Sequence, residues 1–83
     1  MYAIKLIPQA QKDLNNLPPK IFQKTKTVIF GLGQTPRPQG AIKLTEQEGY
    51  RVRIGDYRIL YRIDDTAKEI YIYRIKHRKE AYR

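Results

Sequence analysis

The sequence contains no cysteine, no tryptophan and a single histidine among its 83 residues. Without cysteine the chain can form neither a disulfide nor a thiolate zinc site. One histidine among scattered acidic residues also disfavours a catalytic metal site, so we expect no cofactor. No apolar run approaches the length of a membrane-spanning helix, and the first residues lack the apolar segment of a signal peptide. These absences favour a protein of the reducing cytoplasm that has no membrane partner.

Acidic residues are also scarce. Eight Asp and Glu oppose 17 Lys and Arg, which gives a formal net charge of +9 and an isoelectric point near 10.0. A small domain with this charge attracts polyanions or an acidic protein, although a basic surface can also serve solubility alone. Ten of the 17 basic residues lie in residues 50–83, and this uneven placement favours a binding surface. The length predicts one domain, residues 1–83.

Local patterns predict the first half of the fold. Residues 2–7 are rich in strand formers and favour a strand. Two helical segments follow; Pro8 suits the first turn of the first, and the pair Pro18-Pro19 ends that helix and starts the second. Their apolar stripes are Ala10, Leu14 and Leu17 in the first, and Ile21, Thr25, Val28 and Leu32, flanked by Phe22 and Ile29, in the second. Gly31 and Gly33 indicate where the second helix ends.

The second half of the chain is predicted to be a sheet. Residues 34–40 contain two prolines and a glycine and indicate a loop. Four strand-like runs follow, AIKLT, YRVRI, YRILYRI and EIYIYRI, separated by residues that favour turns. The order β-α-α-β-β-β-β predicts an α+β domain, in which an N-terminal strand and a two-helix hairpin precede an antiparallel meander with the helices packed on one face.

The Gly55-Asp56 pair predicts a two-residue hairpin with a primed turn. This turn pairs Arg53 with Arg58 and Val52 with Ile59. Because side chains alternate between faces, the apolar residues then face the helices; the residues expected on the other face are Arg51, Arg53, Arg58 and Arg62. Opposed like charges destabilise a strand pair, so we expect either a phosphate held between the guanidinium groups or ion pairs with acidic residues; the acidic candidates are Glu46, Glu48, Asp64 and Asp65.

The segment IKHRKEAYR, residues 75–83, adds further candidates. His77 carries the only side chain type of the sequence that ordinarily titrates near neutrality, although a lone histidine is often structural. The ambiguous length of the preceding turn leaves open which residues of the last strand share the face of the arginines.

The segments YRVRIGDYRILYRI (50–63) and HRKEAYR (77–83) resemble the RelE family of bacterial toxins, part of the RelE/ParE superfamily of toxin–antitoxin modules. The resemblance covers essentially the whole chain. It implies a ribosome-dependent endoribonuclease that cuts mRNA in the ribosomal A site and inhibits translation. The implied reaction is metal-independent attack of a ribose 2′-hydroxyl on the adjacent phosphate, which leaves a cyclic phosphate. It also implies an acidic, RelB-like antitoxin as partner, besides the ribosome and mRNA.

The resemblance assigns roles to individual residues. Arg58 and Arg78 would stabilise the transition-state charge, and Tyr82 would stack on the scissile nucleotide. Arg51 and Arg53 stand where the well-known branch of the family has lysines. Because arginine does not lose its proton, they can clamp phosphate but not act as a base, so we interpret His77 as the proton carrier. The catalytic candidates are Arg51, Arg53, Arg58, His77, Arg78 and Tyr82, and the further RNA-binding candidates are Lys43, Arg62, Lys76, Lys79 and Arg83.

Two other functions fit the same residues. The ParE branch shares the fold but poisons DNA gyrase and cuts no RNA; it usually lacks the full set of basic residues with the terminal tyrosine. A non-catalytic basic RNA-binding module would also use an arginine-bearing sheet and tyrosines, and its binding would depend steeply on salt.

Overall fold

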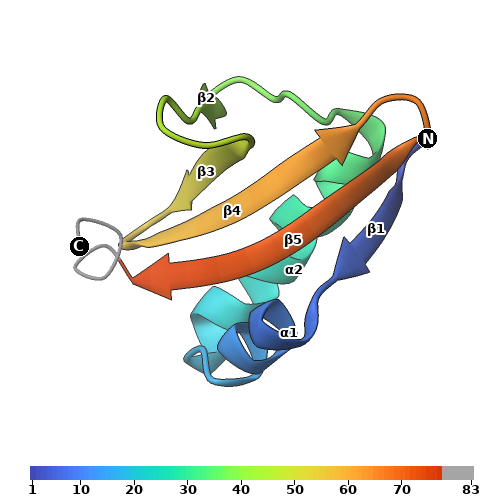
Figure 1. Ribbon diagram of the computed structural model, residues 1–83. Helices are drawn as coiled ribbons and strands as arrows, with labels where there is room; N and C mark the ends of the chain where they lie inside the picture. Colours follow the sequence, from blue (N-terminus) through green and yellow to red (C-terminus); the bar gives the residue numbers. More distant parts are fainter. Residues whose placement is uncertain (78–83) are drawn as a thin grey trace.

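The computed structural model describes residues 1–77. The elements are β1 (Ala3–Leu6), α1 (Pro8–Asn15), α2 (Pro19–Gln34), β2 (Ile42–Lys43), β3 (Tyr50–Ile54), β4 (Tyr57–Asp64) and β5 (Glu69–His77). They form one five-stranded sheet in the order β1-β5-β4-β3-β2. The predicted antiparallel meander, β2 to β5, is confirmed, and β1 adds a parallel strand beside β5. Figure 1 shows the outer face of the sheet, with both helices on the other side.

The first helix begins at the predicted proline, and the second begins within the predicted Pro18-Pro19 pair. Pro8 and Pro19 are the first residues of α1 and α2. The predicted end of α2 was too early, because the helix continues through Gly31 and Gly33 to Gln34. Gly33 lies close to the start of the sheet: a Cβ there would lie 3.1 Å from the carbonyl oxygen of Tyr2, so a larger residue would require a shift of a few tenths of an ångström. Neither helix of the described 77 residues is long and apolar enough to cross a membrane.

The core lies between the helices and one face of the sheet. The fully buried Tyr61 lies at its edge and donates a hydrogen bond from its hydroxyl to the carbonyl oxygen of Pro36, at 2.8 Å. Burial raises the pKa of Tyr61 to about 12. The buried apolar side chains come from both layers and comprise Ala10, Leu14, Ile29, Leu32, Val52, Ile54, Ile59, Tyr61, Ile70, Ile72 and Ile75. Val52, Ile54, Ile59 and Tyr61 of the predicted hairpin therefore face the helices, whereas Leu60, opposite Arg51, lies on the outer face.

The predicted hairpin register is confirmed. Arg53 lies opposite Arg58 and Val52 opposite Ile59. Gly55 has a φ of +56°, whereas Lys68 is the one non-glycine residue with positive φ within residues 1–77. A positive φ at the first turn residue only is typical of a type II′ turn, one of the two primed turns.

A β-bulge in β5 sets the faces of the last strand. Leu60 pairs with Arg74 but Tyr61 pairs with Ile72, so Tyr73 is the extra residue. Ile72, before the bulge, and Ile75, after it, both face the helices. They are three residues apart, whereas residues on one face of a regular strand are separated by an even number. The bulge therefore turns Lys76 to the outer face, opposite Arg58.

Asp13 of α1 forms hydrogen bonds with the edge of β5, at a point beyond the end of β1. Its Oδ2 accepts hydrogen bonds from Nε of Arg74 at 2.8 Å and from the backbone N–H of Ile75 at 2.9 Å. The last pair between β1 and β5 joins Leu6 to Ile72. The carboxylate thus satisfies a backbone donor that a longer β1 would otherwise pair, and it ties α1 to the strand that carries Lys76.

We expect Asp13→Asn to lower the free energy of unfolding by about 2 kcal/mol at neutral pH, as for hydrogen bonds to a charged group. Burial raises the pKa of Asp13, but the hydrogen bonds from Arg74 and Ile75 outweigh it, so the pKa lies below the ordinary value of 3.8. This stabilisation is present above pH 3.8 and is lost as the pH falls through the lower folded-state pKa. Urea unfolding of both proteins at neutral and acid pH measures the difference.

The matched control for this prediction is Asp56→Asn, in the exposed β3–β4 turn. Its free energy of unfolding should stay close to that of the original chain at neutral pH. A gap between the original chain and Asp13→Asn that did not narrow in acid would contradict the role of the Asp13 carboxylate.

Candidate functional site

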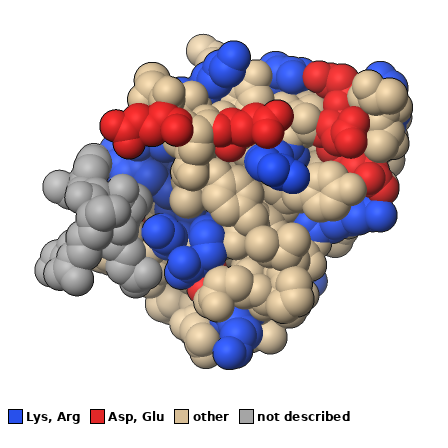
Figure 2. Space-filling view, viewed as in Figure 1, with Lys and Arg blue, Asp and Glu red and all other residues tan. Residues whose placement is uncertain are grey.

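A cavity of about 560 Å³ lies on the outer face of the sheet. Its basic lining residues are Lys43, Arg51, Arg58 and Lys76, and its remaining lining consists of Ile42, Leu44, Thr45, Glu46, Gln47 and Leu60. We call it the basic cavity. Figure 2 shows basic side chains gathered where β3, β4 and β5 approach one end of the sheet. Four predicted residues, one from each of four strands, therefore line one hollow.

The strand register explains why the cations meet. Arg58 in β4 lies opposite Arg53 in β3 on one side and opposite Lys76 in β5 on the other. Only 6% of Arg58 is exposed, so its guanidinium group is almost wholly inside the protein. Like charges on neighbouring strands repel one another, and removing a charge from water is costly. An anion bound in the cavity would offset both the repulsion between the cations and the cost of removing Arg58 from water, and a phosphate would fit because its geometry matches that of guanidinium groups.

Arg53 lies beside the basic cavity rather than in it. Its Nε donates a hydrogen bond to the carbonyl oxygen of Gly55 at 2.9 Å, which holds the side chain against the turn. With Arg51 and Arg58 it borders a smaller hollow of about 90 Å³. Arg53 can therefore add positive potential to the site and contact a ligand that extends past β3.

Arg62 is placed away from this group. Its Nη1 lies 3.9 Å from Oε2 of Glu48, and it lines a different hollow together with Tyr71 and Tyr73. Of the ion pairs expected for the hairpin arginines, this is the one found among residues 1–77. Three of the four hairpin arginines thus share one region, and the fourth belongs to another.

His77 ends β5 and lies opposite Tyr57. The two rings meet edge to face, with their centroids 5.1 Å apart. Tyr57 shares the helix-facing side of the hairpin with Ile54 and Ile59, so the register places His77 on the side opposite Lys76. Arg78, Lys79, Tyr82 and Arg83 lie outside the described residues.

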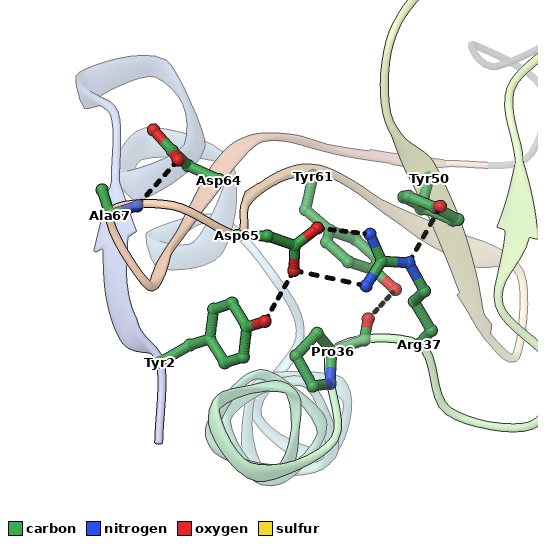
Figure 3. A network of polar contacts seen from close by, with 8 residues as sticks. All are labelled: Tyr2, Pro36, Arg37, Tyr50, Tyr61, Asp64, Asp65 and Ala67. Atoms are coloured by element: carbon green, nitrogen blue, oxygen red, sulfur yellow. Dashed lines mark hydrogen bonds and ion pairs between the residues drawn. The ribbon is translucent and has the colours of Figure 1, made fainter.

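Arg37, which no sequence pattern singled out, lies at the centre of a polar network (Figure 3). Its Nη2 lies 2.9 Å from Oδ2 of Asp65, and its Nε donates to the hydroxyl of Tyr50 at 3.0 Å. Tyr2 also donates to Asp65, at 2.6 Å. The hydrogen bond from Arg37 lowers the pKa of the Asp65 carboxyl. The network fixes the loop that leads into β2 and hence positions Lys43.

The loop between β2 and β3 forms one wall of the basic cavity. The N–H of Leu44 donates to the carbonyl oxygen of Gly49 at 3.0 Å, which closes the loop. Gly49 has a φ of +124°, and a Cβ on it would lie 2.7 Å from the carbonyl oxygen of Tyr61. Gln47 lines both the basic cavity and the hollow of Arg62. The sequence signal for this loop was the polar run before Gly49, and it indicated only a turn.

In residues 1–77 no group of three or more Asp, Glu or His side chains comes together in a way that could hold a metal ion. Glu46 is the acidic residue among the described residues that line the basic cavity. The described part of the cavity is therefore a set of side-chain cations with one carboxylate on the loop wall.

Comparison with known proteins identifies this architecture. Residues 4–82 match the family model described as ParE toxin of type II toxin-antitoxin system, parDE. Toxin RelG of Mycobacterium tuberculosis is 37% identical over 84 residues, which cover 99% of this chain and 97% of that protein. The toxin-antitoxin complex RelBE2 of M. tuberculosis contains a chain with a TM-score of 0.82 and 32% identity, and the match covers 93% of this chain and 98% of that one.

A structure from an archaeon has the same fold. The RelE-RelB complex of Pyrococcus horikoshii matches with a TM-score of 0.80 and 29% identity, over 93% of this chain and 94% of that chain. The fold and these similarities define the class as a toxin of a type II toxin–antitoxin system. The chain belongs to the ParE toxin family of the RelE/ParE superfamily, which confirms the predicted membership.

Proposed function

We propose that the chain is a ribosome-dependent endoribonuclease that cuts mRNA in the ribosomal A site and thereby stops translation in the cytoplasm. The observation that carries this proposal is the basic cavity, in which Arg51, Arg58 and Lys76 surround a volume of about 560 Å³. A cavity of this size accommodates a nucleotide-sized group. The similarity to proteins named RelG and RelE supports the same function.

The proposed reaction is an internal transfer at one phosphate. The ribose 2′-oxygen loses its proton to a base and attacks the adjacent phosphorus, and the bond from phosphorus to the 5′-oxygen breaks. The leaving oxygen takes up a proton, and a 2′,3′-cyclic phosphate remains. Arg51, Arg58 and Lys76 stabilise the negative charge that develops on the phosphate oxygens. Preformed cations act strongly here because the cavity is partly shielded from water.

The proton transfers require a further group, because the arginines stay protonated. His77 is the proposed proton carrier; because its ring lies with Tyr57 on the side of β5 opposite Lys76, this role requires the ring to turn toward the basic cavity when RNA binds. We expect His77→Gln to reduce the rate of mRNA cleavage in a translation extract about 100-fold, a typical loss for one acid–base group. The comparison is with Tyr57→Phe, which keeps the ring contact. Near-normal cleavage by His77→Gln would reject this role.

Primer extension on a reporter mRNA in a translation extract tests the proposed function. We expect cuts in register with codons that appear only when ribosomes occupy the message. The description of the matching family as ParE makes gyrase inhibition the second candidate. A chain of that kind would leave the mRNA intact and trap gyrase on DNA. Ribosome binding without any cleavage would instead indicate the non-catalytic RNA-binding module.

An acidic antitoxin is the proposed partner. The similar chains come from structures of toxin-antitoxin complexes, and a net charge of +9 suits an acidic protein. A domain of 83 residues buries a modest share of its surface, so binding should add stability. We expect the thermal unfolding midpoint of the purified chain to rise when the product of the neighbouring antitoxin gene is added. An unchanged midpoint would contradict the partnership.

A further inference from the structure

A second hollow, of about 370 Å³, lies beyond the β2–β3 loop. It is lined by Ile7, Gln47, Glu48, Arg62, Tyr71 and Tyr73. We call it the tyrosine hollow. It differs from the basic cavity in offering two aromatic rings beside one cation, and the reaction proposed above does not use it.

The strands hold the aromatic side chains of this hollow in place. Tyr71 of β5 lies directly opposite Arg62 of β4 on the outer face. Its hydroxyl donates to Oε1 of Glu69 at 2.5 Å. Two residues along β5, the hydroxyl of Tyr73 accepts a hydrogen bond from Nε2 of Gln47 at 3.5 Å. The short hydrogen bond to Glu69 holds the ring of Tyr71 in place before a ligand arrives, which reduces the entropy lost on binding.

The tyrosine hollow is the neighbour of the basic cavity on the other side of the β2–β3 loop. Gln47 lines both, and the two share the outer face of β4. Arg58 and Arg62 are four residues apart on that strand, which corresponds to about 13 Å at the rise of an antiparallel strand. A polynucleotide whose phosphate occupies the basic cavity can therefore place another of its nucleotides at the tyrosine hollow.

We propose that the tyrosine hollow binds an unpaired base of the same RNA strand, which stacks on Tyr71 or Tyr73 while Arg62 contacts the adjoining phosphate. The proposal rests on the proposed function, since it names a second subsite for the same substrate. Proteins commonly hold unpaired RNA bases by stacking them on aromatic rings and arginine. Glu48 also lines the hollow, and its Oε2 lies 3.9 Å from Nη1 of Arg62, so a phosphate would compete with this carboxylate for the guanidinium group. The two aromatic rings and the neighbouring basic cavity favour RNA over a peptide as occupant.

The test measures binding of fluorescein-labelled, 2′-O-methylated oligouridine, which cannot be cut, to the full chain by anisotropy. Loss of one stacked base costs about 1–3 kcal/mol, so Tyr71→Leu or Tyr73→Leu should raise Kd about 10-fold. Tyr71→Phe and Tyr73→Phe keep the rings and should stay within about threefold of the original chain. In the ribosome assay the Leu variants should raise KM and leave kcat unchanged.

Two further measurements test the same subsite by other changes. Arg62→Gln, at an exposed side chain, should weaken binding of the oligonucleotide and reduce its salt dependence. An abasic nucleotide placed along the oligonucleotide should weaken binding to the original chain at one position, and that penalty should disappear in the Leu variants. Thermal unfolding of each variant shows whether it is folded.

The outcomes separate this proposal from the proposed function. If the original chain cuts mRNA and the Leu variants bind and cut as it does, the subsite is rejected and the ribonuclease function stands. If the original chain does not cut mRNA, and the Leu variants still lose affinity for the oligonucleotide, the subsite stands and the reaction is rejected. Loss of antitoxin affinity with unchanged oligonucleotide binding would make the hollow a protein-docking site and reject the proposal.

Discussion

Changing Arg58 to Gln is expected to lower the rate of mRNA cleavage about 100- to 1,000-fold, the usual cost of removing one preorganised group that stabilises transition-state charge. Arg58 lies between Arg53 and Lys76 and is only 6% exposed, so its charge is held at a defined position in the basic cavity. Arg58→Lys should retain more activity than Arg58→Gln, because it keeps the charge but loses the bidentate fork. Primer extension under single-turnover conditions measures both rates.

The interpretation needs evidence that the variants fold and still reach the ribosome. Thermal unfolding addresses the first point and co-sedimentation with ribosomes the second, because binding relies on many basic residues at once. Lys24→Gln, on the exposed face of α2, removes the same charge outside the site and should cut normally. Cleavage by folded Arg58→Gln within about threefold of the original rate would rule out a transition-state role for Arg58.

Gly49→Ala is expected to cause the largest loss of stability among these substitutions, about 3 kcal/mol or more. A non-glycine residue at positive φ costs about 1–2 kcal/mol by itself. Here φ is +124° and the new Cβ would also lie 2.7 Å from the carbonyl oxygen of Tyr61, where backbone has to move. Urea unfolding of the purified variant gives the free energy, provided that the chain still folds cooperatively.

Substitutions at two other glycines distinguish the cost of backbone strain from the cost of a steric clash with Tyr61. Gly40 has a φ of +96° but open space where a Cβ would lie, so Gly40→Ala should cost only the conformational strain, about 1 kcal/mol. Gly31 lies inside α2, where an added Cβ would meet nothing within 4 Å, and Gly31→Ala should stabilise the helix by about 1 kcal/mol. Equal losses at Gly49 and Gly40 would show that the contact with Tyr61 is unimportant.

The hairpin was predictable because its signals are local. Gly55 and Asp56 lie between two alternating runs, and this combination determines both the turn and the pairing of Arg53 with Arg58. The starts of both helices were predictable for the same reason, since Pro8 and Pro19 are fixed in φ and lack a backbone donor. From these elements alone the sequence places Arg51, Arg53 and Arg58 at one end of the sheet.

The remaining features depend on residues far apart in the chain. The pairing of β1 with β5 and the ion pair of Arg37 with Asp65 each join segments that no local pattern connects. The bulge at Tyr73 was also hidden, because counting in twos along β5 would turn Lys76 toward the helices. That single extra residue decides that Lys76 lines the basic cavity and that His77 meets Tyr57.

The parallel pairing of β1 with β5 also determines when the basic cavity can be completed during synthesis of the chain. β1 leaves the ribosome first, yet its partner strand is made after every other element of the sheet. Lys76 is carried by that same late strand, so the cation set is incomplete until β5 has emerged. Contacts between distant segments form slowly. If the basic cavity carries the activity as proposed, the nascent chain would be inactive until β5 is made, which gives a partner the interval of translation in which to bind.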